Sequence, residues 1–449
     1  MKTDREAVVW TRMGMRPVKM GRIYVTGSEC RFTYDQDFLE TGLPGLGVVY
    51  PPEIVRETTI VRKRSEFFDL LPPIQLLIPP RSGKNFQRQL ILSYLAKKGT
   101  VPSGGFDADW EILMIAGHGG IGHLDVFLND DKAVEWYSVP GKHRFFEISD
   151  DFGFSLKELL TWLDADAEAL IRMIGPTPTV GGAIPKLLLT IPDTGWDGRI
   201  GLPGKIGGHG MTDVILKFEQ ARSYPGIIEL EALALDLHEK AGFEVPRTWM
   251  TSIHDIPTLA VERFDRDKNC TPLFTETLYS IFASGDPGIT TPYSTTYDAI
   301  GRAMDRSPID LVSDKKSSKR HLLKRLLMAL ATGNGDLHLE NLSIIRKGNV
   351  LCFSPVYDPT PMRAYSVHNL LTPMPFGQYG EVHLKEALVR FTKNLGFRKK
   401  DLSGLIEDVL SVTKDYTDRV QSLKTLPDAN KKNLTAIVDS VRGEMRKVI

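Results

Sequence analysis

The chain has 449 residues, of which 42% are hydrophobic and 25% charged, a composition typical of a globular protein with two or three domains. Lys+Arg and Asp+Glu both number 56, so the formal net charge is zero, which argues against a strongly basic nucleic-acid binder. Three widely spaced cysteines without a CxxC pair argue against a disulfide framework and a cysteine zinc site. No apolar run approaches the ~18 residues of a membrane span. The first residues lack the apolar core of a signal peptide, so we expect a cytoplasmic protein without a membrane partner.

The first part of the chain, residues 1–150, has the mixed pattern of an α/β subdomain. Short β-type runs are expected at residues 47–50 and 58–61. A helix is predicted at residues 86–97, and Gly99 ends it.

The second part, residues 151–266, is predicted to contain a helix and then strands around a second helix. Ser155 and Glu158 form a capping-box pattern, which predicts that the first helix starts there. A glycine-dense loop at residues 195–210 separates the first two strands. The later elements are expected as strands at 186–191 and 214–218, a helix at 229–241 and a strand at 258–264.

The third part, residues 267–449, is predicted to be mostly helical. Residues 284–318 are rich in Ser, Thr, Gly, Pro and Asp, which predicts a mobile loop region. The later elements are expected as a helix at 321–332, a hairpin of strands at 342–345 and 350–353, and three or four amphipathic helices in the tail 384–449.

The pattern that carries chemistry follows the helix that precedes the hairpin. Asp336 and Asn341 have the Asp-x-x-x-x-Asn spacing of a kinase catalytic loop, and adjacent glycines let the backbone turn and expose the Asp. Asp358 follows the hairpin and can reach the same magnesium ion as Asn341, since hard cations prefer oxygen ligands. Upstream, Lys217 ends a strand, and Glu231 on the next helix is its expected partner. The order Lys, Asp, Asn, Asp is that of the residues needed for phosphoryl transfer.

Each of these residues also has a structural interpretation, which the sequence alone leaves open. A lone Asp-x-x-x-x-Asn is common by chance, a strand-end Lys is usually exposed, and an Asp before Pro usually starts a turn. Asp151-Phe152-Gly153 spells the kinase metal motif, but it precedes the Lys and the catalytic loop, so we interpret it as a linker turn. Gly117 to Gly122 spells G-x-G-x-x-G, but no long helix follows it, so a dinucleotide site is not expected.

At these residues the chain resembles the HipA family of bacterial Ser/Thr protein kinase toxins, and the likeness covers most of its length. The segment from Thr179 to Leu187 is similar to the phosphate loop of the family, and the strand ending at Lys217 to its nucleotide-lysine strand. The other similar segments are 259–266, matching the adenine hinge, and 335–341 with 357–358, matching the catalytic and metal segments.

The resemblance implies an α+β, two-lobed protein-kinase-like fold of the HipA type. Residues 1–150 would form a mixed α/β N-terminal subdomain, 151–266 the nucleotide-binding N-lobe and 267–449 the mostly helical C-lobe. Asp336 would be the general base, and Asn341 and Asp358 would hold magnesium. The implied contacts to ATP are Gly181, Gly182, Ala183, Lys186, Lys217, Glu262, Phe264 and His338, and Thr179 matches the family's autophosphorylated Ser.

The function implied by the resemblance is that of an ATP- and magnesium-dependent Ser/Thr protein kinase, the toxin of a type II toxin–antitoxin pair. Its target would be a translation component such as an aminoacyl-tRNA synthetase. Its partner would be a small helix-turn-helix antitoxin, through which alone it would reach DNA. Two alternatives remain open: a lipid or small-molecule kinase, and a catalytically weak partner of a DNA-binding repressor. The chain departs from the family pattern around residues 273–284 and 284–318, where the family contacts substrate and partners.

Overall fold

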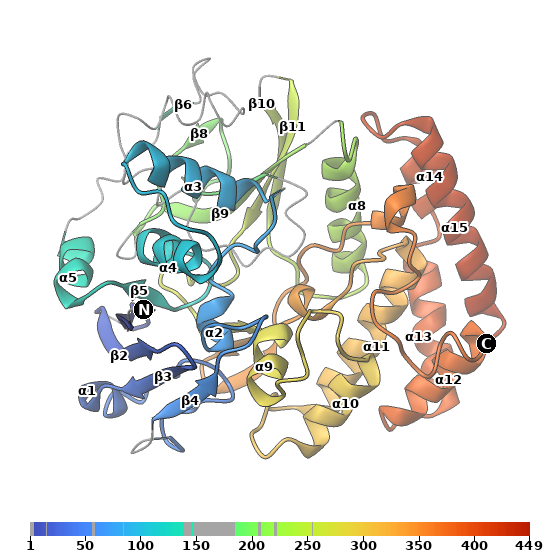
Figure 1. Cartoon of the computed structure of the whole chain (residues 1–449). Coiled ribbons are helices and arrows are strands. Elements are labelled where there is room, and N and C mark those ends of the chain that lie inside the picture. Colours follow the sequence, from blue (N-terminus) through green and yellow to red (C-terminus); the bar gives the residue numbers. More distant parts are fainter. Residues whose placement is uncertain are drawn as a thin grey trace. The chain divides into compact units, whose positions relative to one another are not determined.

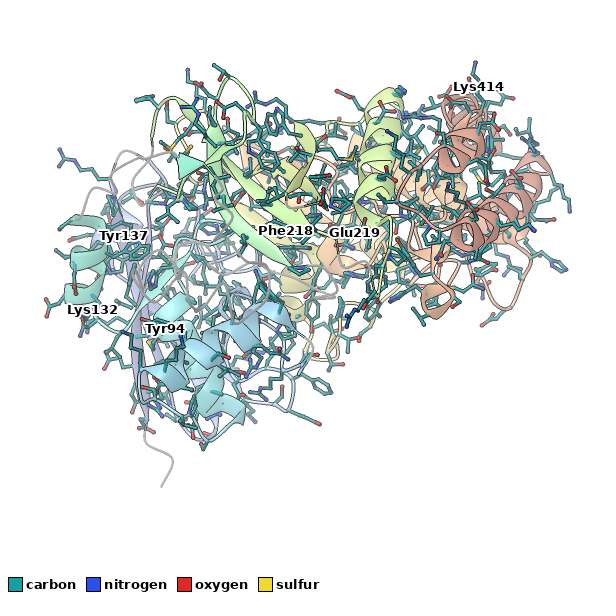
Figure 2. All side chains as sticks on the ribbon, turned by 90° about the horizontal axis from the view of Figure 1, so that it is seen from above. Tyr94, Lys132, Tyr137, Phe218, Glu219 and Lys414 are labelled. Atoms are coloured by element: carbon teal, nitrogen blue, oxygen red, sulfur yellow. The ribbon has the colours of Figure 1, made fainter. Side chains whose placement is uncertain are left out.

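The structure is a computed structural model and consists of two compact units, which we describe separately. Figure 2 labels Phe218 and Glu219, where the chain first passes from unit 1 into unit 2. Unit 1 comprises Met1–Phe218, Arg247–Glu276 and Ser280–Pro287, and unit 2 comprises Glu219–Pro246, Thr277–Tyr279 and Gly288–Ile449. The described residues are 4–14, 16–55, 59–83, 85–138, 146–147, 185–204, 208–219, 222–253 and 255–449.

Unit 1 begins with an antiparallel sheet whose strands are ordered β4-β3-β2-β1-β5 (Figure 1). In β3, Cys30, Phe32 and Tyr34 are buried and the residues between them are exposed, as expected for a sheet with one face on the core. The strands are β1 (Arg5–Thr11), β2 (Val18–Val25), β3 (Glu29–Tyr34), β4 (Ile60–Lys63) and β5 (Asp125–Phe127).

The strand expected at residues 47–50 is wrong. The Tyr50 N–H donates to the Gly47 carbonyl at 3.0 Å and closes a turn there, and two prolines follow. The run expected at 58–61 corresponds to β4, which covers Ile60–Lys63. Strands β1 to β3 were not predicted, although β2 and β3 alternate buried and exposed residues as half-buried strands do.

The helices of unit 1 pack beside this sheet, with α1 against β2 and both α4 and α5 against β5. Helix α3 has the predicted bounds, and the Asn85 side chain caps it by accepting the Arg88 N–H at 2.9 Å. The helix predicted to start at Ser155 lies outside the described residues. The helices are α1 (Gln36–Leu39), α2 (Pro72–Gln75), α3 (Phe86–Lys97), α4 (Gly105–Ala116) and α5 (Asp130–Ser138).

A second antiparallel sheet of unit 1 has the order β10-β11-β9-β7. Its inner strands match the predicted positions, but β10 was missed. Half of the β10 residues are exposed, including Met250 at 56%, so no alternating apolar pattern marks the strand. The strands are β7 (Lys186–Pro192), β9 (Met211–Phe218), β10 (Thr248–Ile253) and β11 (Ile256–Glu262), and a separate short pair joins β6 (Phe146–Glu147) to β8 (Arg199–Ile200).

Unit 2 is mostly helical, and α11 packs against α10, α13 and α15 (Figure 1). The four helices of the tail, α12 to α15, confirm the prediction for residues 384–449. The elements are α8 (Ile227–Lys240), α10 (Tyr297–Arg306), α11 (Lys315–Thr332), β13 (Ser343–Lys347), β14 (Val350–Phe353), α12 (Leu384–Asn394), α13 (Lys399–Val412), α14 (Tyr416–Gln421) and α15 (Asp428–Arg446); β12 (Thr275–Thr277) and α9 (Leu278–Gly285) include residues of both units.

The prediction of a mobile loop over residues 284–318 is wrong, because helix α10 lies within this range. The Thr296 side chain caps this helix by accepting the Ala299 N–H at 3.0 Å. Tyr297, Ile300 and Met304 recur on one face and are buried. The loop-like composition hid a helix with few apolar residues, all of them on that face. Within the described ranges, no helix has both the length and the apolar character needed to cross a bilayer.

Glu276 of β12 is a buried carboxyl group in unit 1. The Val48 N–H donates to its Oε2 at 2.6 Å, and the Ser280 hydroxyl donates to its Oε1 at 2.5 Å. Burial raises the pKa of Glu276 to about 7, and the two hydrogen bonds only partly oppose this. The folded protein therefore favours the neutral acid.

Glu276→Gln is predicted to stabilise the protein at high pH. The amide oxygen accepts the Val48 N–H and the amide nitrogen donates to the Ser280 hydroxyl, so both hydrogen bonds survive without a buried charge. Because the folded pKa is raised, the destabilising charge is absent at pH 4 and is fully present above pH 7. Urea unfolding is expected to show a gain of up to about 3 kcal/mol at pH 8 and almost none at pH 4. Equal gains at both pH values would contradict this assignment.

Candidate functional site

The catalytic-loop pattern in unit 2 begins where α11 ends. Gly333 ends the helix in the left-handed conformation, with φ +77°, which glycine adopts without strain. The next residue, Asn334, is 1% exposed, and its side-chain oxygen accepts the Asp336 N–H at 2.8 Å. This bond fixes the backbone from which the Asp336 carboxylate projects.

Gly335 lies where the loop is in close contact with a later part of unit 2. A Cβ atom there would lie 2.6 Å from the Leu370 carbonyl oxygen and 3.0 Å from Cγ of Arg363. A side chain at position 335 would therefore displace the loop, which explains the second glycine of the motif.

Asp336 has a partly exposed carboxylate beside a buried imidazole. Its side chain is 37% exposed, whereas that of His338 is 1% exposed, and 3.5 Å separates Oδ1 of Asp336 from Nε2 of His338. Nδ1 of His338 accepts the Glu340 N–H at 3.2 Å, so the proton of the neutral ring lies on Nε2 and faces Asp336. His338 was predicted as a nucleotide contact, and the structure places it beside the candidate base.

Asn341 is tied to the same loop by its side chain. Its Nδ2 donates to the Asp336 carbonyl at 2.7 Å. The amide nitrogen is thereby used, and the amide oxygen is the atom suited to a cation. Asn341 is 8% exposed, so this oxygen has a defined position.

Tyr357 connects the Asn341 segment to the Asp358 segment. Its buried hydroxyl donates to the Glu340 carbonyl and lies 2.6 Å from the Ser343 hydroxyl oxygen. Glu340 precedes Asn341 and Tyr357 precedes Asp358, so one hydroxyl holds the two candidate metal ligands in neighbouring segments. Sequence analysis gave no role to this hydroxyl.

Asp358 has an unusual backbone conformation for a residue with a side chain. Its φ is +46°, in the left-handed region, and Pro359 follows it. Such conformations cost about 1–3 kcal/mol and cluster at functional sites. The turn expected for an Asp before Pro is absent, and only the left-handed φ marks the position.

Besides burial, the charge of Asp336 raises the pKa of two nearby tyrosines. Burial and then the Asp336 charge raise the pKa of Tyr293 to about 12, and the same two causes raise the pKa of Tyr224. The ring of Tyr293 lies edge-on to His338, with centroids 5.0 Å apart. Tyr293 and Tyr224 therefore belong to the surroundings of the catalytic loop, although neither was predicted.

Unit 1 contains a second candidate cluster, at the ends of β7 and β9. Lys186 and Lys217 are directly opposite each other in the antiparallel register, so both side chains lie on the same face of the sheet. Lys186 is 8% exposed and Lys217 is 3% exposed. A multivalent anion on that face of the sheet would be attracted to both ammonium groups.

The hinge segment of unit 1 follows β11. The carboxylate of Glu262 pairs with the Arg247 guanidinium at 2.9 Å, and the Glu262 N–H donates to the Arg247 carbonyl. The Arg263 N–H donates to the Asp213 carbonyl at 2.9 Å, and Phe264 is half-buried. These bonds fix the backbone at the predicted adenine contact.

Three charged residues that sequence analysis missed brace this hinge. Arg263 and Arg266 both pair with the Asp265 carboxylate at 2.8 Å in the interior of unit 1. Both guanidinium groups donate to the Gly120 carbonyl at 2.5 Å, and the Gly122 N–H donates to Asp265 at 2.8 Å. The G-x-G-x-x-G motif thus contacts the hinge through its backbone. The charged residues of the hinge segment 259–266 were the sequence feature that could have predicted these ion pairs.

Part of the predicted site cannot be placed. Thr179, Gly181, Gly182 and Ala183 lie outside the described residues, as does Asp151-Phe152-Gly153. Among the described residues, no three His, Cys, Asp or Glu side chains gather as a metal-binding group. The candidate metal ligands in unit 2 are therefore one amide oxygen and one carboxylate.

Comparisons with known proteins identify related sequences and folds. A family model for the HipA-like C-terminal domain matches residues 179–416. A Haemophilus influenzae protein named "Putative kinase" is 24% identical over 331 residues, which are 67% of this chain and 90% of that protein. HipA of Shewanella oneidensis MR-1, solved with HipB and its operator DNA, has a TM-score of 0.64 and 15% identity, with 97% of each chain covered. The predicted α+β, two-lobed kinase-like fold is confirmed.

Proposed function

We propose that the chain, which belongs to the family of HipA-like C-terminal domains, is an ATP- and magnesium-dependent Ser/Thr protein kinase. The observation that carries the proposal is the hydrogen-bonded cluster of unit 2, which fixes Asp336, Asn341 and the segment of Asp358 around one hydroxyl. The relative from Haemophilus influenzae named "Putative kinase" supports a kinase activity in general.

Asp336 is the proposed general base. Its carboxylate is partly exposed, so a hydroxyl group can reach it, while Asn334 fixes its backbone. The proton of the Ser or Thr hydroxyl passes to Asp336 while the hydroxyl oxygen bonds to the γ-phosphorus and the bond to ADP breaks. The Nε2 atom of His338 lies 3.5 Å from the same carboxylate.

The donor atoms fit magnesium, which prefers a few oxygen ligands completed by phosphate and water. Asn341 offers its amide oxygen because its nitrogen is bound to the Asp336 carbonyl. Asp358 offers a carboxylate from a backbone held in one conformation. When bound, the ion would neutralise phosphate charge and align the γ-phosphate.

Unit 1 supplies the proposed contacts to the rest of ATP. The ammonium groups of Lys186 and Lys217, which lie on one face of the sheet, would contact the phosphates. The backbone from Glu262 to Phe264 would bind adenine. The remaining contacts in this proposal come from the phosphate-loop residues Gly181, Gly182 and Ala183.

The proposed biological role is that of the toxin of a type II toxin–antitoxin pair in the cytoplasm. One solved structure with a similar fold is HipA of Shewanella oneidensis MR-1 with HipB and its operator DNA. By analogy, the partner here is a small helix-turn-helix antitoxin, and this chain with zero net charge reaches DNA only through it. The proposed target is a translation component such as an aminoacyl-tRNA synthetase.

Two alternative functions make different demands on the same residues. A lipid or small-molecule kinase would keep Asp336, Asn341 and Asp358 and transfer phosphate to a non-protein hydroxyl. A catalytically weak partner of a repressor would need none of the three. The bonds that fix Asp336 and Asn341 favour the catalytic alternatives over the last.

Asp336→Asn is predicted to lower phosphoryl transfer by about 10²–10⁴-fold, because the amide cannot accept the hydroxyl proton. The purified protein and the variant are incubated with γ-labelled ATP and a whole-cell lysate, and labelled protein and lipid are separated. Label in protein supports the proposal, and label confined to lipid supports the first alternative. Equal growth inhibition by both proteins in cells would support the repressor partner.

Thr179→Ala is predicted to abolish autophosphorylation. A phosphate at Thr179, beside the phosphates of ATP, would repel them, so modification would expel the phosphate loop and silence the kinase. Intact-mass and peptide mass spectrometry of purified protein should show one added phosphate at Thr179 in the wild type. The added mass should be absent in both Thr179→Ala and Asp336→Asn. Phosphate that persists in Thr179→Ala would rule out this position.

A further inference from the structure

The segment of unit 2 at residues 364–380, after the metal-ligand candidate Asp358, has an unusual composition. It contains no Asp, Glu, Lys or Arg, although 25% of the whole chain is charged. We call residues 364–380 the uncharged segment. A surface without formal charges cannot select a ligand by ion pairing, so its selectivity must depend on apolar contact and shape.

The uncharged segment lies directly against the catalytic loop. A Cβ atom on Gly335 would lie 2.6 Å from the Leu370 carbonyl oxygen and 3.3 Å from the His368 carbonyl oxygen. Gly335 immediately precedes Asp336, and one residue of extended chain spans only about 3.3–3.6 Å. A hydroxyl that reaches Asp336 therefore brings its neighbouring residues beside Leu370.

Hydrogen bonds hold the start of this segment in place. Nε2 of His368 lies 2.8 Å from the Tyr224 hydroxyl, and the Tyr365 hydroxyl donates to the Pro225 carbonyl at 2.9 Å. The Arg363 guanidinium donates to Oδ1 of Asn369 at 3.1 Å. The backbone is thus fixed beside the catalytic loop.

Large aliphatic side chains on this fixed backbone face solvent. Val367 is 77% exposed and Leu370 is 62% exposed, and Leu371 is half-buried beside them. Tyr293, on the His338 side of the catalytic loop, is also 45% exposed. An anchored backbone that presents apolar side chains beside a catalytic group has the properties of a recognition surface.

We propose that residues 366–371 dock the acceptor segment of the substrate and select a Ser or Thr with a large aliphatic residue beside it. This inference rests on the proposed kinase function. An aliphatic side chain gains free energy by covering Val367 and Leu370, whereas a charged one would lose water against these two apolar side chains. The substrate class is a protein with an apolar neighbour within two residues of the phosphorylated hydroxyl.

The test uses the full chain, γ-labelled ATP and a heat-inactivated, phosphatase-treated bacterial lysate as substrate. Val367→Asn with Leu370→Asn makes the surface polar, and Val367→Ile with Leu370→Met keeps it apolar. Val350→Asn is the matched control, because Val350 is 50% exposed on β14 of the same unit. The readouts are the initial rate of protein labelling, the KM for ATP and the sequences around the labelled residues.

The Asn pair is expected to lower the labelling rate about tenfold or more, with the KM for ATP unchanged. The Ile/Met pair and Val350→Asn should label at the wild-type rate, and Leu, Ile, Val or Met should predominate at one position within two residues of the acceptor. Wild-type labelling by the Asn pair, or charged residues at that position, would overturn the inference and leave the kinase function intact. No protein labelling by the wild type would overturn both.

Discussion

The candidate active site depends on the hydrogen bonds of the Tyr357 hydroxyl group. This hydroxyl donates to the Glu340 carbonyl and contacts the Ser343 hydroxyl, and so joins the segment of Asn341 to that of Asp358. Burial raises the pKa of Tyr357, and the nearby Asp358 charge adds to this, so the hydroxyl keeps the proton that it donates. The strained φ of Asp358 persists because surrounding contacts of this kind hold it.

Charge is distributed differently in the two units. In unit 1, Lys186 and Lys217 share a buried register pair, an arrangement that suits a multivalent anion. In unit 2, Asp336 is partly exposed, and the acidic and amide oxygens suit a cation and a hydroxyl. A magnesium–triphosphate complex carries both kinds of charge.

Local patterns in the sequence predicted much of this arrangement. The four tail helices follow from apolar periodicity, the end of α3 follows from Gly99, and the loop from Gly333 to Asn341 follows from a short motif in one stretch of chain. Features that depend on distant residues could not be predicted. The strand register that pairs Lys186 with Lys217 depends on how two strands align. The hydrogen bond from Tyr357 to the Glu340 carbonyl depends on how two separate segments pack. Strand β10 was missed because half of its residues are exposed. Helix α10 was missed because it lies in a stretch of loop-like composition, although its buried residues recur on one face.

The central claim is that Asn341 and Asp358 hold one divalent ion together with ATP. The most direct test is electron paramagnetic resonance of Mn²⁺ bound in the presence of a non-hydrolysable ATP analogue. Asn341→Ala and Asp358→Ala are each expected to weaken Mn²⁺ binding about tenfold or more, while Val350→Asn leaves it unchanged. Wild-type Mn²⁺ affinity in both alanine variants would contradict the account.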